Sequence, residues 1–221
     1  NGPSTLLMAQ LSVGGPMDLM VAEEGVSKIN IWRYSSGNFV FRTDVVQQNS
    51  ITALATIDVN GDARSDIVST SAVDHELTIF KASPSLVYSH SDSISFPTPL
   101  HPVHTVVRDM DSDGSLDLVV SSISSSGHGS ITTYYGGGQN ISNADHNLPV
   151  SVIPTQVAMG DFNGDGKEEI AAYEPLGPGL YFVNMTSAAL GTIVAPAGVK
   201  AMESRDLDSD GKDDLVMMTG S

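Results

Sequence analysis

The chain of 221 residues is long enough for one sizeable core, and its 26 acidic against 10 basic residues give a formal net charge of −16. This charge argues against binding to nucleic acid or insertion into an anionic membrane, which carry the same sign. The sequence has no cysteine, which excludes disulfides and thiol chemistry, and no apolar stretch approaches the ~20 residues of a membrane span.

The first 50 residues predict short strands and no helix. The start, NGPSTLLMAQ, lacks the basic region and long apolar run of a signal peptide, so we expect a processed or truncated chain. KINIWRYS (28–35) and NFVFRTDVV (38–46) are rich in β-branched and aromatic residues, which favours strands. Trp32 is expected to pack in the core at the place of Phe80 and Phe182 in later repeats, with a sugar-stacking platform as the alternative.

Four acidic loops follow along the chain. They are DVNGDARSDI from Asp58, DMDSDGSLDL from Asp109, DFNGDGKEEI from Asp161 and DLDSDGKDDL from Asp206. Each has oxygen-bearing side chains at positions one, three, five and nine, and Ile or Leu at position ten. Carboxylates this close repel one another unless a cation lies among them, and calcium binds six to eight oxygen ligands. The pattern predicts one calcium ion in each loop, about four in all, which would halve the net charge.

These loops differ from the helical calcium loop of the EF-hand. That loop needs an acid at position twelve, where this chain has Ser69, Val120, Ala172 and Met217. The residues after each loop, such as DIVSTS and DLVVSSIS, suit a strand better than a helix. Each loop is therefore predicted to join two strands.

The loops begin 45 to 52 residues apart, a period typical of propellers. One period upstream, QLSVGGPMDL keeps Asp18 and Leu19 at positions nine and ten but has Gln10, Ser12 and Gly14 at the ligand positions, so no calcium is expected there. After each loop come a strand, a turn, a short apolar strand and a more variable fourth strand. We predict a single all-β domain, a β-propeller of about four and a half four-stranded blades, at about 5–50, 51–101, 102–153, 154–198 and, in part, 199–221.

The motif D-x-[DN]-x-D-G-x-x-[DE]-[IL] between the first two strands of a blade resembles the FG-GAP/VCBS repeat family, which includes the calcium-binding integrin alpha-subunit propeller. The resemblance implies side-chain ligands at positions one, three, five and nine and a backbone carbonyl ligand at position seven. The implied ligands are Asp58, Asn60, Asp62, Arg64 and Asp66; Asp109, Asp111, Asp113, Ser115 and Asp117; Asp161, Asn163, Asp165, Lys167 and Glu169; and Asp206, Asp208, Asp210, Lys212 and Asp214.

The chain departs from the family pattern in two ways. Ala63 stands at the usual glycine position of the first acidic loop, with Gly61 two residues earlier, so a looser turn is expected there. The Phe-Gly and Gly-Ala-Pro signatures are not recognisable, which moves the match towards the VCBS-like branch.

The last repeat, ending in DDLVMMTGS, has room for only two strands. Such a half blade leaves an unpaired edge that another strand can join. Three interpretations compete: a fragment of a larger propeller, which we favour; a propeller that closes with five blades; and completion by another subunit in a head-to-tail assembly.

No catalytic constellation is evident, since no G-x-S-x-G elbow or phosphate-binding glycine loop occurs. His101 and His104 in LHPVHT are expected in a turn between blades rather than at a transition metal. Tyr134 and Tyr135 are expected at an exposed loop as ligand contacts. Paired loop carboxylates suggest a glycosidase, but calcium would leave them unable to transfer protons.

The sequence therefore predicts a non-catalytic, extracellular calcium-binding module for interaction, adhesion or assembly, with a protein partner or its own copies. The alternatives are a glycan-binding lectin and an accessory propeller of a secreted polysaccharide-degrading enzyme. An extracellular location follows from the preference of such loops for high calcium. Asn140 and Asn184 begin N-x-[ST] glycosylation patterns, which matter only in a eukaryotic secretory protein.

Overall fold

The computed structural model is built from β-strands alone in its described residues, and none of these residues forms a helix long and apolar enough to cross a membrane. The structure describes residues 3–23, 25–46, 50–98, 101–124, 127–137, 140–141, 146–150, 154–176, 179–183 and 191–220.

The strands form four antiparallel sheets of four strands and a last sheet of two. The first sheet contains β1 (Pro3–Ala9), β2 (Asp18–Glu23), β3 (Lys28–Ser35) and β4 (Asn38–Val46). The second contains β5 (Ile51–Ile57), β6 (Asp66–Ser71), β7 (Glu76–Ala82) and β8 (Tyr88–Pro97). The third contains β9 (His101–Arg108), β10 (Asp117–Ile123), β11 (Gly129–Tyr134) and β14 (His146–Val150).

A small separate ribbon of β12 (Gly136–Gly137) and β13 (Asn140–Ile141) is inserted in the sequence between β11 and β14, which pair directly with each other. The fourth sheet contains β15 (Gln156–Gly160), β16 (Glu169–Tyr173), β17 (Gly179–Val183) and β18 (Gly191–Val194). The last sheet contains β19 (Val199–Arg205) and β20 (Asp214–Thr219). Within each sheet every strand pairs with its neighbour in sequence, apart from this inserted ribbon.

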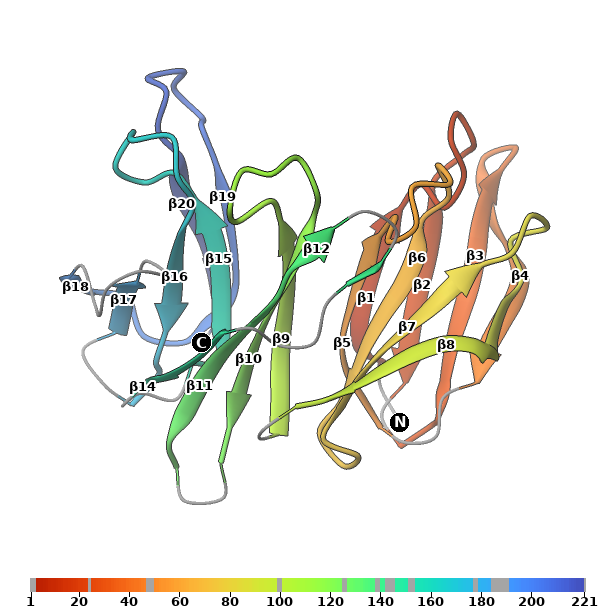
Figure 1. The fold of residues 1–221 in the computed structure, drawn as a ribbon, viewed down its shortest axis with the longest axis horizontal. Coiled ribbons are helices and arrows are strands. Elements are labelled where there is room, and N and C mark those ends of the chain that lie inside the picture. Colours follow the sequence, from red (N-terminus) through yellow and green to blue (C-terminus); the bar gives the residue numbers. More distant parts are fainter. Residues whose placement is uncertain are drawn as a thin grey trace.

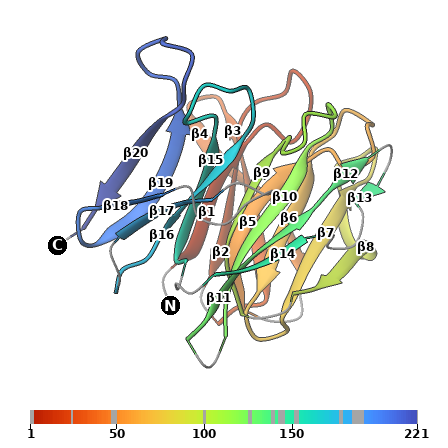
Figure 2. The ribbon, with the colours of Figure 1, turned by 60° about the vertical axis from the view of Figure 1, so that its left-hand side comes forward.

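The sheets stand side by side in an arc (Figures 1 and 2). Their first strands, β1, β5, β9, β15 and β19, contact one another in succession and line a central hollow of about 980 Å³. The strands alternate residues between their two faces, so each inner sheet can pack against a neighbour on both sides. The predicted all-β arrangement of repeated four-stranded sheets is confirmed.

Four apolar clusters lie between consecutive sheets. Met20, Ile29 and Ile31 of the first sheet pack against Ile67 and Phe80 of the second, and all five are 0% exposed. The other clusters join the second sheet to the third, the third to the fourth, and the fourth to the last. Burial of these side chains is the main force that holds the arc together.

Several local predictions are wrong. The segment HPVHT lies in a strand and not in a turn, because His101–Arg108 forms β9. Tyr134 is 1% exposed and packs between the second and third sheets, while Tyr135 is partly buried. Phe182 faces the last sheet, and its neighbour Val183 pairs with Ile170 in the register that Phe80 shows with Ile67.

Acid is expected to destabilise the protein through His104, which lines the central hollow. Its Nδ1 atom is buried with no hydrogen-bond partner among the described residues, and burial lowers its pKa to about 4. An unfolded histidine has a pKa of about 6.5, so between these values the unfolded state binds the proton more strongly than the folded state. The free energy of unfolding should therefore fall by about 3 kcal/mol between about pH 7 and about pH 4.

This pH dependence is measured by urea unfolding in chelator, which keeps calcium binding out of the comparison. The His104→Gln variant keeps a polar side chain that does not titrate, so its unfolding free energy should fall less steeply. Parallel pH profiles for the two proteins would contradict the assignment to His104.

Candidate metal centres

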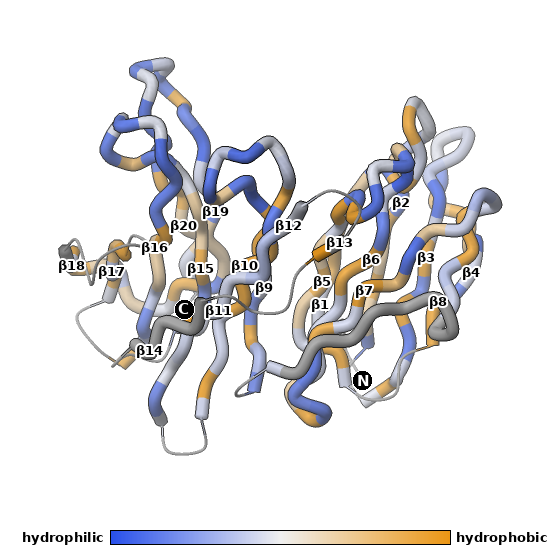
Figure 3. The backbone as a smooth tube through the Cα atoms, in the orientation of Figure 1, coloured by the Kyte–Doolittle hydropathy of each residue, from blue (hydrophilic) through white to orange (hydrophobic). Residues whose placement is uncertain are grey.

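The four acidic loops and the degenerate first copy each connect the first and second strands of their sheet. All five lie on the same side of the arc, at the top of Figure 1. This follows from the topology, because every first strand runs towards the same end. Figure 3 shows mostly hydrophilic residues in these loops and more hydrophobic residues along the strands.

Each loop folds around the side chain at its first position. In the loop that begins at Asp109, the Gly114 N–H donates to Asp109 Oδ2 at 2.9 Å and the Asp113 N–H donates to Asp111 Oδ1 at 3.2 Å. The Ser115 N–H donates to Asp113 Oδ1 at 2.6 Å. The same three bonds recur at the same positions in the loops that begin at Asp58, Asp161 and Asp206. The repeated sequence therefore specifies a repeated backbone.

Two positions in each loop adopt left-handed backbone angles. Position six is Ala63 in the first acidic loop, with φ of 63°, and glycine in the other three. The Ala63 N–H nevertheless donates to Asp58 Oδ2 at 2.8 Å, as glycine does elsewhere. The looser turn predicted there is wrong: alanine is held in the conformation that glycine adopts more easily.

The side chain at position nine is an anchor that ties the loop to the sheet. Asp117 is 0% exposed, and its two oxygens accept hydrogen bonds from the Met110 N–H at 2.6 Å and the Gly136 N–H at 2.7 Å. Asp66 likewise joins the N–H of Val59 to that of Ala82. One donor lies in the loop and the other at or just after the end of the third strand, so the anchor connects the loop to the third strand of its sheet.

Burial raises the pKa of Asp117, with Asp111 and Asp109 adding to the effect, although the bonds from Gly136 and Met110 oppose it. Burial also raises the pKa values of Asp66 and Glu169. These carboxylates therefore carry their charge less readily than in water. A cation beside them would favour the charged form.

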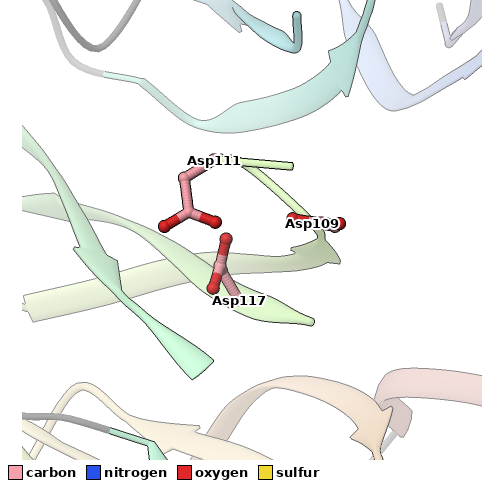
Figure 4. A group of neighbouring side chains, drawn as sticks. All are labelled: Asp109, Asp111 and Asp117. Carbon is pink, nitrogen blue, oxygen red and sulfur yellow. The ribbon is translucent and has the colours of Figure 1, made fainter. Parts of the chain in front are cut away.

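The oxygens converge in the two loops whose third position is aspartate. Asp109, Asp111 and Asp117 each offer an oxygen within 4.8 Å of the others, as do Asp206, Asp208 and Asp210 (Figure 4 shows the first group). A hydrogen-bonded carboxylate oxygen keeps a further lone pair, so the anchor Asp117 can also ligate. An all-oxygen set on a tight loop suits a hard cation such as calcium.

Neighbouring loops are joined across the gaps between sheets. The Ser65 N–H donates to Leu11 O at 3.4 Å, and the Asp213 N–H donates to Asp161 O at 2.9 Å. Arg108, at the end of β9, reaches Glu168 at 3.3 Å and Asp213 at 3.2 Å. The acids at position eight thus link three sheets, a role that the ligand pattern did not reveal.

In the degenerate first copy, arginine side chains contact the carboxylate at position nine, which in the second and third sheets accepts backbone N–H groups. Asp18 is 0% exposed, and its carboxylate accepts two hydrogen bonds from Arg33, at 2.9 and 3.1 Å. Arg42 lies 3.9 Å away, and the bonds to Asp18 raise the pKa of the Arg33 guanidinium. This copy satisfies its anchor with side chains of its own third and fourth strands.

Replacing Asp18 with asparagine is expected to lower the free energy of unfolding by about 3 kcal/mol, equally in calcium and in chelator, because two arginines lose their buried partner. Chemical unfolding in both buffers measures this. Asp44→Asn, which breaks the solvent-exposed 2.7 Å pair with Lys28, is the control and should have little effect. A loss for Asp18→Asn in calcium alone would contradict the account.

The structure brings three of the implied carboxylates within reach of one ion in each of two loops, but it does not bring His101 and His104 to one centre. The His101 Nδ1 atom lies 2.8 Å from Ala72 O, and its ring lies 4.3 Å from that of His75 between centroids. Of the two glycosylation patterns, residues 184–186 and Ser142 lie outside the described residues.

Comparison with known proteins agrees with this architecture. The profile of the FG-GAP-like repeat matches residues 58–120 and 109–172, and that of the FG-GAP repeat matches 154–192. No curated protein is a significant match in sequence.

Solved structures share the fold at low identity. BBS1N in complex with ARL6DN, soaked with lead, has a TM-score of 0.68 at 16% identity over 92% of this chain and 60% of that one. The mercury-soaked complex gives 0.60 at 13% identity, covering 99% and 76%. The V. cholerae biofilm matrix protein Bap1 gives 0.60 at 18% identity, covering 98% of this chain and 35% of its own. Together with the repeats, these similarities confirm the predicted β-propeller class.

Proposed function

Because the chain belongs to the FG-GAP-like repeat family, we propose that it is a calcium-stabilised, non-catalytic extracellular module that binds other protein surfaces in adhesion or assembly. The observation that carries this proposal is the repeated loop: four copies with the same internal hydrogen bonds, two of them with three carboxylates within reach of one ion.

Each loop would hold one calcium ion, about four in all. Side-chain oxygens at positions one, three, five and nine and the position-seven carbonyl supply the ligands implied by the family. Asn60 and Asn163 replace one carboxylate in two of the loops, so these two sites carry less negative charge and should bind calcium more weakly.

The same geometry supports a structural role for these carboxylates over a catalytic one. Asp109 and Asp161 each accept several backbone hydrogen bonds within their loops. In Asp161 burial raises the pKa, but the bonds from Gly166, Gly164 and Asp165 outweigh it and lower the pKa overall. A general acid needs a raised pKa and a proton to give, whereas this group is held as an anion.

A protein partner is supported by the surface and by the neighbours. BBS1N was solved in complex with ARL6DN, and Bap1 is described as a biofilm matrix protein. Among the described strands β20 pairs only with β19, and we propose that a further strand completes this sheet. The extracellular location rests on the calcium loops and on the matrix neighbour.

Native mass spectrometry of the chain in calcium and in chelator tests the proposal. We expect a species with about four calcium ions that loses them in chelator, and two of the four should leave first as calcium is lowered. A chain that binds no calcium at millimolar concentration would overturn the central claim.

A further inference from the structure

The third and fourth acidic loops, which begin at Asp161 and Asp206, meet at an arginine from a neighbouring sheet. Arg108 is the last residue of β9, and β9, β15 and β19 lie side by side (Figure 1). Its side chain donates to Met159 O of β15 at 3.2 Å and to Ser204 Oγ of β19 at 3.5 Å. The guanidinium therefore lies where the strands that lead into the two loops come together.

Arg108 also contacts the acid at position eight of each of these loops. Its Nε atom lies 3.3 Å from Glu168 Oε2, and its Nη2 atom lies 3.2 Å from Asp213 Oδ2. Each acid directly precedes the position-nine ligand implied for its loop, Glu169 or Asp214. One cation thus holds the two loops next to their anchors.

The two loops are also bonded directly to each other. The Asp213 N–H donates to Asp161 O at 2.9 Å, and the Asp161 N–H donates to Asp213 Oδ2 at 3.2 Å. Asp161 is the first implied ligand of the third loop, and both of its backbone polar groups are bonded to the fourth. Ordering one of these loops therefore restrains the other.

The lack of a side chain at residue 160 makes room for this arrangement. Gly160 ends β15 directly before Asp161, at the place that Arg108 has in β9. A Cβ atom there would lie 2.6 Å from Asp213 Oδ2 and 2.7 Å from Asp213 Cβ, closer than a Cβ atom approaches its neighbours in proteins. Glycine at this place lets Asp213 reach both Arg108 and the Asp161 N–H.

The first acidic loop has different partners. At its position eight, Ser65 donates to Gln10 O and Leu11 O of the degenerate copy. The residue directly before this loop is Ile57, which is 3% exposed, and position eight of the second acidic loop is Leu116. None of these side chains can form an ion pair, so the first loop serves as an internal reference for the third and fourth.

We propose that Arg108 and Asp213 couple calcium binding in the third and fourth acidic loops, so that an ion in either loop raises the affinity of the other. An ion that fixes Asp161 also restrains Asp213, and the fourth loop then loses less conformational freedom when it binds its own ion. Linkage makes the effect equal in both directions. Repulsion between the two ions is screened over about 8 Å at physiological ionic strength and should not reverse it. The coupling rests on the proposed calcium role.

A calcium titration followed by amide NMR reports each loop separately. The position-six N–H donates to the first ligand in every loop, so the signals of Ala63, Gly114, Gly166 and Gly211 follow the four sites. Asp208→Ala removes one of the three converging carboxylates of the fourth loop and should silence that site. The calcium concentration at the midpoint of the Gly166 signal should then rise about ten-fold, while that of Ala63 should change less than about two-fold.

Two further variants disturb the contacts between the loops and leave every implied side-chain ligand in place. Arg108→Lys keeps the positive charge, but one ammonium group cannot hold Glu168 and Asp213 as the planar guanidinium does. Gly160→Ala displaces Asp213 and changes no charge. In either background the effect of Asp208→Ala on the Gly166 midpoint should fall from about ten-fold to less than about two-fold. The same spectra show whether each variant is folded.

An unchanged Gly166 midpoint in the Asp208→Ala variant would overturn the proposal. So would a ten-fold shift that persists with both Arg108→Lys and Gly160→Ala. The titration also separates the coupling from the calcium role. If all four signals respond to calcium but independently of one another, the sites stand and the coupling is wrong. If none responds at millimolar calcium, both proposals are wrong.

Discussion

Asp117→Asn is expected to lower the free energy of unfolding by about 2 to 4 kcal/mol in chelator as well as in calcium. Both oxygens of Asp117 accept buried backbone N–H groups, from Met110 and Gly136. An amide of the same shape can accept only one of these bonds and turns its NH₂ towards the other donor. The buried donor left without a partner destabilises the fold whether or not an ion is bound.

Asp113→Asn is the matched control in the same loop. Asp113 is exposed and accepts the Ser115 N–H through one oxygen, which asparagine can also do. The substitution removes only a negative charge. It should therefore lower the free energy of unfolding in calcium and leave it nearly unchanged in chelator. Urea unfolding of both variants in both buffers separates the anchor from the ligand. The account fails if the two variants behave alike.

Removing calcium is expected to produce the largest effect of all. At free calcium about ten times Kd, each site contributes about 1.4 kcal/mol, so four sites contribute about 6 kcal/mol. For a chain of this length that corresponds to a fall of roughly 10 to 20 °C in melting temperature. Without the ions, the repulsion among neighbouring loop carboxylates is no longer balanced.

Thermal unfolding in calcium, in magnesium and in chelator measures this effect. Magnesium should restore less stability, because it requires a stricter octahedral geometry and dehydrates reluctantly. Ionic strength is held equal in all three buffers, so that general screening does not imitate binding. The same melting temperature in calcium and chelator would show that the loops are stable without ions.

The repeat and the loops could be read from sequence because their determinants are local. Asp109 meets its hydrogen-bond partners Asp113 and Gly114 within five residues, and the aliphatic run after the loop marks a buried strand. Such short-range patterns need no knowledge of distant segments. The strand positions 28–35 and 38–46 were predictable for the same reason.

The faces of the strands were harder to predict, because a shift of one residue moves a side chain to the other side of a sheet. The sequence pattern aligns Phe182 with Phe80, whereas the hydrogen-bond register places Val183 there. Tyr134 was expected in a loop, yet it ends β11 opposite Leu118 and is buried.

Contacts between distant segments could not be predicted from the sequence pattern. Arg33 could be paired with Asp18 only once the hairpin register was known. Arg108 meets Asp213 from 105 residues away, and only the arrangement of three sheets brings them together. Glu168 and Asp213 stand at position eight, outside the implied ligand set, and nothing in the local sequence indicates that they face an arginine.

The confinement of strand-to-strand hydrogen bonds to single sheets has a mechanical consequence. Strand-to-strand hydrogen bonds run within each sheet, whereas packed side chains and a few loop contacts join one sheet to the next. Under tension applied along the chain, the sheets should therefore yield one at a time. A sheet of about 50 residues would release roughly 17 nm of extended chain. Each event would dissipate work while the remaining sheets still bear load.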